Sequence, residues 1–188
     1  MAGMFGAVAA VLMLLDFPVP LVPPFVKFDL SELPVLLGGL FLGPVGGGIV
    51  TGLKVLLHLV FRGSLTVGIG ELANFTGSIA YMLPGVLLFR HRDSMRDACA
   101  SFAAATVVVS VVIVAGNYFV FFPAYARLMG LSVDAFVAMG HSVNSSVHDL
   151  WTLMVYCLFP FNLFKYGVTS VLAALLYRRL RRFSAFGR

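Results

Sequence analysis

Eight strongly polar side chains lie within or beside apolar segments of the chain, and they are the residues best suited to chemistry: Asp29, Lys54, His58, Glu71, Asn74, Asn117, Asn162 and Lys165. Six of them form pairs three or four residues apart, the spacing of one helix face: Lys54 with His58, Glu71 with Asn74, and Asn162 with Lys165. A charge at the centre of a membrane helix costs about 2.5–3.5 kcal/mol on insertion scales, so such residues usually face a protein interior. Their amide, ammonium and carboxylate groups can hydrogen-bond a small polar ligand.

Each of these residues also has a purely structural interpretation. Lys54 and His58 can neutralise Glu71, and Glu71 can instead stabilise a helix start through the helix dipole. The asparagines can act as hydrogen-bonding groups between helices. Lys165 is too far from either end of its segment to reach the membrane surface easily, which favours a ligand-binding role. The pattern therefore predicts a polar cavity. It does not decide whether each single residue binds a ligand or has a structural role.

The sequence lacks the residue sets that catalysis or a metal ion would need. Gly47 and Gly52 have the spacing of a phosphate loop, but no Lys-Ser/Thr pair follows them. Residues 140–142 read Gly-His-Ser without the second glycine of a serine-hydrolase elbow. His141 and His148 are seven residues apart, unlike a helical metal pair. We expect a binding protein that is not an enzyme, with no catalytic residue, resident cofactor or metal.

The composition places most of the surface in lipid. Of 188 residues, 60% are hydrophobic and 11% are charged, and the mean hydropathy is +0.99. Soluble domains carry about 25% charged residues. The length suits one domain, a single membrane-embedded substrate-binding unit over residues 1–188. Cys99 and Cys157 are far apart in apolar runs, which predicts reduced thiols.

Six apolar segments predict an all-α, polytopic bundle of six transmembrane helices, over residues 2–17, 32–42, 44–61, 70–89, 98–122 and 147–178. The first run lacks the basic region and cleavage site of a signal peptide, so we expect it to be a membrane helix. A proline-rich loop then interrupts helix at residues 18–24. Gly43-Pro44 breaks the next helix, and a short surface helix is expected before the last segment.

The arginines predict the orientation in the membrane. Two clusters directly follow apolar runs, namely Arg90, Arg92 and Arg96, and Arg178, Arg179, Arg181, Arg182 and Arg188. The opposite side holds only Lys27, Arg62 and Arg127, beside acidic residues. The positive-inside rule thus predicts a multi-pass membrane protein with both termini cytoplasmic and the polar cavity opening outward. The net charge of +5 reflects these loops, and no nucleic-acid motif accompanies it.

Small residues repeat along the first segment at four-residue spacing. The pairs are Gly3 with Ala7 and Gly6 with Ala10. Such pairs let another helix approach closely, either within the bundle or from a partner protein. Spacing alone does not distinguish the two uses.

Six fragments in order resemble a known family. They are residues 23–34 with Leu37-Gly38-Gly39, Leu42-Gly43-Pro44, residues 54–58, residues 70–75, Gly116-Asn117-Tyr118 and residues 160–165. Together they resemble the riboflavin-binding S components of energy-coupling factor (ECF) transporters, over about residues 3–179. The resemblance implies a six-helix S-component bundle, an outward-facing vitamin site, and closure of the first loop over the ligand.

The resemblance also assigns roles to single residues. Asn117, Asn162 and Lys165 match positions that hydrogen-bond the flavin ring. The positions of Glu71 and Asn74 match a motif that lines the pocket, Asp29 matches the lid loop, and Lys54 and His58 are carried over with them. Gly3 and Ala7 match a small-residue contact for the transmembrane coupling protein, which works with two ATPase subunits.

Other functions remain open on the sequence. The same architecture serves S components for other vitamins or precursors. A secondary transporter acting alone would more often show an inverted repeat, which is not visible here. A membrane enzyme would need the catalytic set that is missing.

Overall fold

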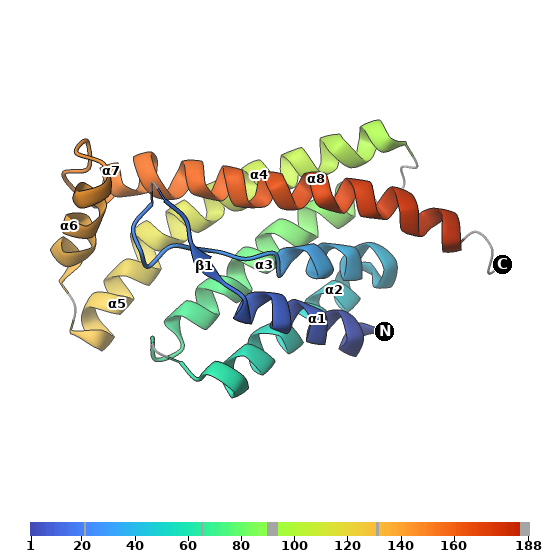
Figure 1. The fold of residues 1–188 in the computed structure, drawn as a ribbon, viewed down its shortest axis with the longest axis horizontal. Helices are drawn as coiled ribbons and strands as arrows, with labels where there is room; N and C mark the ends of the chain where they lie inside the picture. The colour runs from blue at the N-terminus through green and yellow to red at the C-terminus, as the bar shows by residue number, and fades with distance from the viewer. Residues whose placement is uncertain (21, 65, 90–93, 131, 185–188) are drawn as a thin grey trace.

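The computed structural model describes the chain except residues 21, 65, 90–93, 131 and 185–188 (Figure 1). The elements in order are α1 (Ala2–Leu14), β1 (Phe17–Pro18), β2 (Lys27–Phe28), α2 (Glu32–Arg62), α3 (Ile69–Phe89), α4 (Met95–Gly116), η1 (Asn117–Phe121), α5 (Phe122–Met129), α6 (Val133–Val143), α7 (Leu150–Leu153), η2 (Met154–Leu158) and α8 (Phe159–Ser184). The fold is helical apart from the antiparallel pair β1–β2, which joins the two ends of the proline-rich loop.

Helix α2 is folded back on itself at Gly43. Gly43 has φ 81° and ψ 176°, a left-handed φ that favours glycine. A straight helix would separate Glu32 and Lys54 by about 33 Å, yet their side chains are in contact at 2.8 Å. A Cβ added to Gly47 would lie 2.8 Å from the Cα of Gly39, so the two halves approach at glycines. The predicted break at residues 43–44 is therefore confirmed.

The helical segments lie alongside one another in alternating directions (Figure 1). The start of α1 and the end of α8 lie at one end of the bundle, whereas α5, α6, α7 and the α2–α3 loop lie at the other. The main apolar core is formed by α1, α2, α3, α4 and α8, around side chains such as Leu36, Tyr81, Met82 and Phe102. A second cluster packs α5 to η2 around Phe122 and Phe136.

Two π-helical turns interrupt the long helices, and each is followed closely by a proline. Segment η1 precedes Pro123, and η2 precedes Pro160. Proline has no N–H to donate and its ring clashes with the carbonyl four residues earlier, so a wider turn relieves the clash. Such turns are frequent at functional sites. Here one begins at Asn117 and the other ends four residues before Asn162.

In the described part of the chain, four helical segments are long and apolar enough to span a membrane: Glu32–Arg62, Ile69–Phe89, Met95–Met129 and Leu150–Tyr177. By this measure the described residues supply four of the six predicted spans. Helix α1 has 13 residues, about 20 Å of helix, and the first half of α2 is also short of the roughly 30 Å hydrocarbon core. Arg90, Arg92 and Arg188, used in the sequence-based orientation, lie outside the described residues.

Candidate functional site

A polar cavity of about 330 Å³ lies beneath the loop between α1 and α2. Its walls come from that loop, α2, α3, α4 with η1, and α8. Seven of the eight sequence-predicted residues line it, namely Asp29, His58, Glu71, Asn74, Asn117, Asn162 and Lys165. Residues more than 130 positions apart are thus brought together at one site. Lys54 is the exception.

A second cavity of about 280 Å³ adjoins the first and is largely aromatic and aliphatic. Phe122, Phe136, Leu158 and Met129 form much of its wall. Six residues line both cavities: Phe25, Thr66, Asn117, Tyr125, Phe161 and Asn162. The two spaces form neighbouring compartments of one site, and the two asparagines stand at the junction. Their volumes suit a drug-sized molecule that is apolar at one end and polar at the other.

Asp29 and Lys165 form a buried ion pair at the polar compartment. Lys165 Nζ donates to Asp29 Oδ2 at 2.7 Å, and the backbone N–H of Ser31 donates to Oδ1 at 2.8 Å. Burial opposes ionisation of Asp29, but Lys165, Lys54 and these hydrogen bonds outweigh it and lower its pKa to about 2. The pair fixes the end of the loop against α8. An ammonium group has three donors, so Lys165 keeps further donors for a ligand.

Several polar groups of the cavity have no protein partner within the described residues. The side-chain amides of Asn117 and Asn162 line the cavity and make no hydrogen bond to the described residues; Asn162 is 7% exposed and Asn117 is half-buried. His58 Nδ1 is also buried without a partner. Buried polar groups are normally satisfied, so the orphaned His58 Nδ1, together with two free amides on the same cavity, indicates a place for a ligand.

Glu71 has a local structural role as well as a cavity position. Its Oε2 accepts from Ser64 Oγ at 2.8 Å and from Thr66 Oγ1 at 3.3 Å. These bonds organise the α2–α3 loop, in which the non-glycine residue Val67 has φ 52°. Asn74 likewise donates to the Gly70 carbonyl at 3.0 Å. Both residues line the cavity and also form hydrogen bonds within their own segment of the chain.

Lys54 lines neither cavity, so the structure does not place it with the other seven predicted site residues. It is completely buried, and its Nζ donates to Glu32 Oε1 at 2.8 Å, Ser78 Oγ at 2.6 Å and Ser31 Oγ at 3.3 Å. The alternative that Lys54 neutralises Glu71 is also wrong, because its partner is Glu32. Glu32 and Lys54 are each eleven residues from Gly43, so a hairpin at Gly43 brings them side by side. That symmetry is the sequence signal that could have found the pair.

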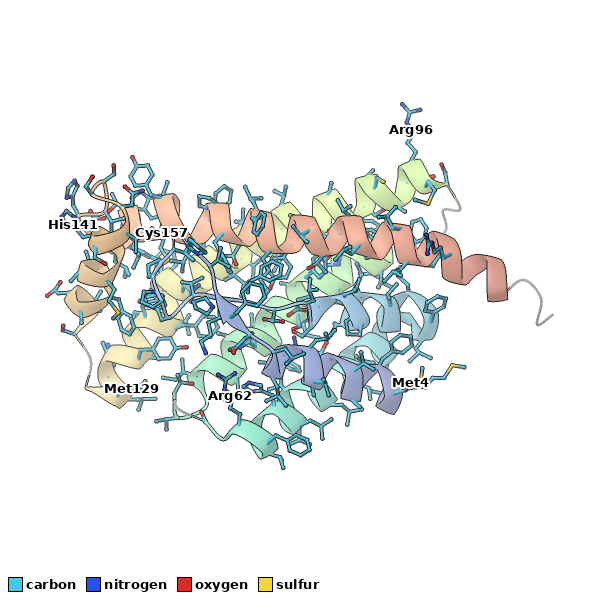
Figure 2. All side chains as sticks on the ribbon, viewed as in Figure 1. Met4, Arg62, Arg96, Met129, His141 and Cys157 are labelled. Atoms are coloured by element: carbon cyan, nitrogen blue, oxygen red, sulfur yellow. The ribbon has the colours of Figure 1, made fainter. Side chains whose placement is uncertain are left out.

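Sequence reasoning also missed a charged group at the edge of the cavity. Asp16 Oδ1 accepts from Arg62 at 2.8 Å, and its Oδ2 lies 3.2 Å from Lys27 Nζ. All three residues line the polar cavity. Figure 2 shows Arg62 among the side chains between the helices, whereas Arg96 extends away from the bundle.

The two small-residue pairs of α1 have different surroundings. Gly6 and Ala10 are buried, and a Cβ added to Gly6 would lie 2.7 Å from Leu53 Cβ. Gly3 and Ala7 are exposed, and nothing lies within 4 Å of a Cβ added to Gly3. Ordinary internal packing therefore explains one pair and leaves the other on an open face.

The comparisons with known proteins agree with this geometry. The model of the family described as "ECF transporter, substrate-specific component" matches residues 1–177. The chain belongs to this family. A solved structure described as the S component of a bacterial ECF transporter superposes with a TM-score of 0.74 at 30% identity, covering 97% of this chain and 94% of that one. The chain is thus a transporter component of the membrane and not an enzyme.

Two curated relatives of this S component carry substrate names. It is 33% identical over 180 residues to the riboflavin transporter RibU of Staphylococcus aureus (strain TCH60), covering 96% of this chain and 88% of the relative. It is 31% identical over 179 residues to the riboflavin transporter FmnP of Bacillus subtilis (strain 168), covering 95% and 88%. The similarity extends across almost the whole chain.

Proposed function

We propose that this S component binds riboflavin in the two joined cavities and presents it to an ECF transport module. The observation that carries the proposal is the pair of unpartnered amides, Asn117 and Asn162, between an aromatic compartment and a polar one. Riboflavin has a flat ring with carbonyl and N–H groups at one edge and a chain of hydroxyls. The names of the two relatives support the same ligand.

The ring fits the aromatic compartment and its polar edge meets the junction. Phe25, Phe122 and Phe136 pack edge to face with one another at centroid distances of 4.9–5.9 Å, a wall suited to an aromatic ring. An amide both donates and accepts, which matches the alternating groups of the ring edge. Asn117, Asn162 and Lys165 are assigned to that edge. His58, Glu71, Asn74 and Asp29 then face the hydroxyl chain or hold the walls around it.

The transport function requires partners. The chain is proposed to span the bacterial cell membrane, in contact with lipid, as six antiparallel segments with both termini in the cytoplasm. The start of α1 and the end of α8 lie at the same end of the bundle, which supports this orientation (Figure 1). The exposed face of Gly3 and Ala7 is assigned to docking on the transmembrane coupling protein. Two ATPase subunits of that module supply the energy.

Titration of purified, ligand-free protein in detergent tests the ligand assignment. Riboflavin fluorescence should be quenched to a one-to-one end point with nanomolar affinity, about −12 kcal/mol. Asn162→Ala should weaken binding by at least about tenfold, because one well-made hydrogen bond contributes roughly 0.5–1.5 kcal/mol and an unpaired ligand group adds more. Asn144→Ala, outside both cavities, is the matched control. Folded protein that binds no riboflavin would move the substrate to another vitamin or precursor.

A further inference from the structure

The cations of the polar cavity are all paired. Its lining contains three, Lys27, Arg62 and Lys165, and three carboxylates, Asp16, Asp29 and Glu71. With His58 neutral, the formal charge of the lining is zero. Lys165 is engaged by Asp29 in the interior. The other two cations share one carboxylate, that of Asp16.

Asp16 holds these two cations together at the open edge of the cavity. It lies 2.8 Å from Arg62 at the end of α2 and 3.2 Å from Lys27 on β2. The three side chains are 18%, 32% and 38% exposed respectively, in contrast to the Asp29–Lys165 pair at 7% and 9%. They therefore stand where the polar end of a ligand would approach solvent.

We propose that Asp16 is a specificity-determining residue that selects against ligands with a phosphate at this end. The inference rests on the proposed riboflavin site, in which the ring lies in the aromatic compartment and the hydroxyl chain extends toward the open edge. A phosphate on that chain carries a charge of about −1.5 to −2 at neutral pH. Arg62 and Lys27 would be its natural partners, since a guanidinium and an ammonium bind phosphate oxygens well. Asp16 occupies both and repels the incoming anion.

Replacement of Asp16 removes this obstacle without removing a cation. The lining then carries one net positive charge, and two donors become free at the edge. Riboflavin has no charge there, so loss of the Asp16 contacts to the loop acts on both ligands alike. The prediction is thus a change in the ratio of two affinities, which a general loosening of the loop would not produce.

The test compares riboflavin with freshly purified flavin mononucleotide on wild type, Asp16→Asn and Asp134→Asn by fluorescence quenching at low salt. Asp134 is exposed in the first turn of α6, so its variant loses the same charge away from the cavity. We expect Asp16→Asn to raise the affinity for the phosphorylated flavin relative to riboflavin by at least about tenfold, and the control to leave the ratio unchanged. The gain should shrink as ionic strength rises from about 0.1 M to 1 M, where the Debye length falls from about 10 Å to 3 Å.

Arg62→Gln gives an independent measurement if Asp16→Asn does not fold. It leaves Asp16 with one fewer cation and should lower the relative affinity for the phosphorylated flavin. An unchanged ratio in the folded variants, or equal weakening of both ligands, overturns the role of Asp16 while riboflavin binding by wild type stands. Wild type that binds neither flavin overturns the proposed function itself and this inference with it.

Discussion

Replacement of Lys54 by methionine should destabilise the fold and leave the ligand contacts intact. Lys54 and Glu32 are 0% and 1% exposed, and the ammonium is the only cation in contact with this carboxylate among the described residues. Methionine keeps the side-chain volume but leaves the buried carboxylate of Glu32 without a cation. Removing one partner of a buried ion pair costs about 3–5 kcal/mol. Glu32 Oε2 already has no hydrogen-bond partner, which places the expected loss toward the upper part of that range.

The double variant Glu32→Gln with Lys54→Met isolates the cause. It removes both charges, so most of the lost stability should return, since uncharged replacements of buried pairs are often neutral. Unfolding in mixed micelles titrated with SDS measures the free energy of each variant. Riboflavin affinity of the folded fraction should stay within about threefold of wild type, well under the tenfold that 1.4 kcal/mol represents.

Lys165→Met is the matched comparison, because it alters the other buried lysine, which lines the cavity. It should impair binding directly. The reasoning is refuted if Lys54→Met retains full stability and yet loses riboflavin affinity by more than tenfold. Lys54 would then contact the ligand, as the sequence alone suggested, and the contact with Glu32 would not describe the folded protein in the membrane.

Three further changes test other parts of the structure. The pKa of Asp29 is lowered to about 2 from its ordinary value of 3.8, so its stabilising effect is complete above 3.8 and is lost as the pH falls toward 2. Thermal stability of wild type should exceed that of Asp29→Asn by a constant margin near neutral pH, and the margin should shrink below about pH 4. Replacing Gly3 and Ala7 with leucine should abolish uptake into cells yet leave riboflavin binding in detergent unchanged, whereas loss of binding would argue against docking at this face. Gly47→Ala should destabilise the bundle by about 1–3 kcal/mol in the SDS assay, because its Cβ would lie 2.8 Å from the backbone of the other half of α2. A neutral result would show that the halves of α2 can move apart.

The sequence predicted the helical segments and most of the cavity because both depend on local patterns. Apolar runs and prolines set the helix limits, and polar residues at helical spacing identified positions that face inward. The α2 turn was visible at Gly43-Pro44 because glycine supplies the left-handed φ there. The number of helices that span the membrane was less predictable, because the first half of α2 is short and packs against the second half.

The partners of the charged residues could not be predicted from local patterns. Glu32 was expected at the start of the 32–42 helix with no assigned partner, but the α2 hairpin buries it against Lys54. Asp16 received no role because its contacts with Lys27 and Arg62 depend on how the loop closes over α2. Such ion pairs depend on which segments pack together in the tertiary structure. A single sequence does not show which distant segments are in contact.

The loop over the site is held with different strength at its two sides, which suits a lid that opens and closes. Asp29 is fixed to Lys165 in the interior, where a broken pair costs about 3–5 kcal/mol. Asp16 meets Arg62 and Lys27 at the solvent edge, where exposed pairs contribute about 0.2–1 kcal/mol and are screened by salt. Opening should therefore begin at the Asp16 side and leave Asp29 in place. The same residue that discriminates against phosphate then also lies where the ligand enters, so selection and entry occur at one edge of the cavity.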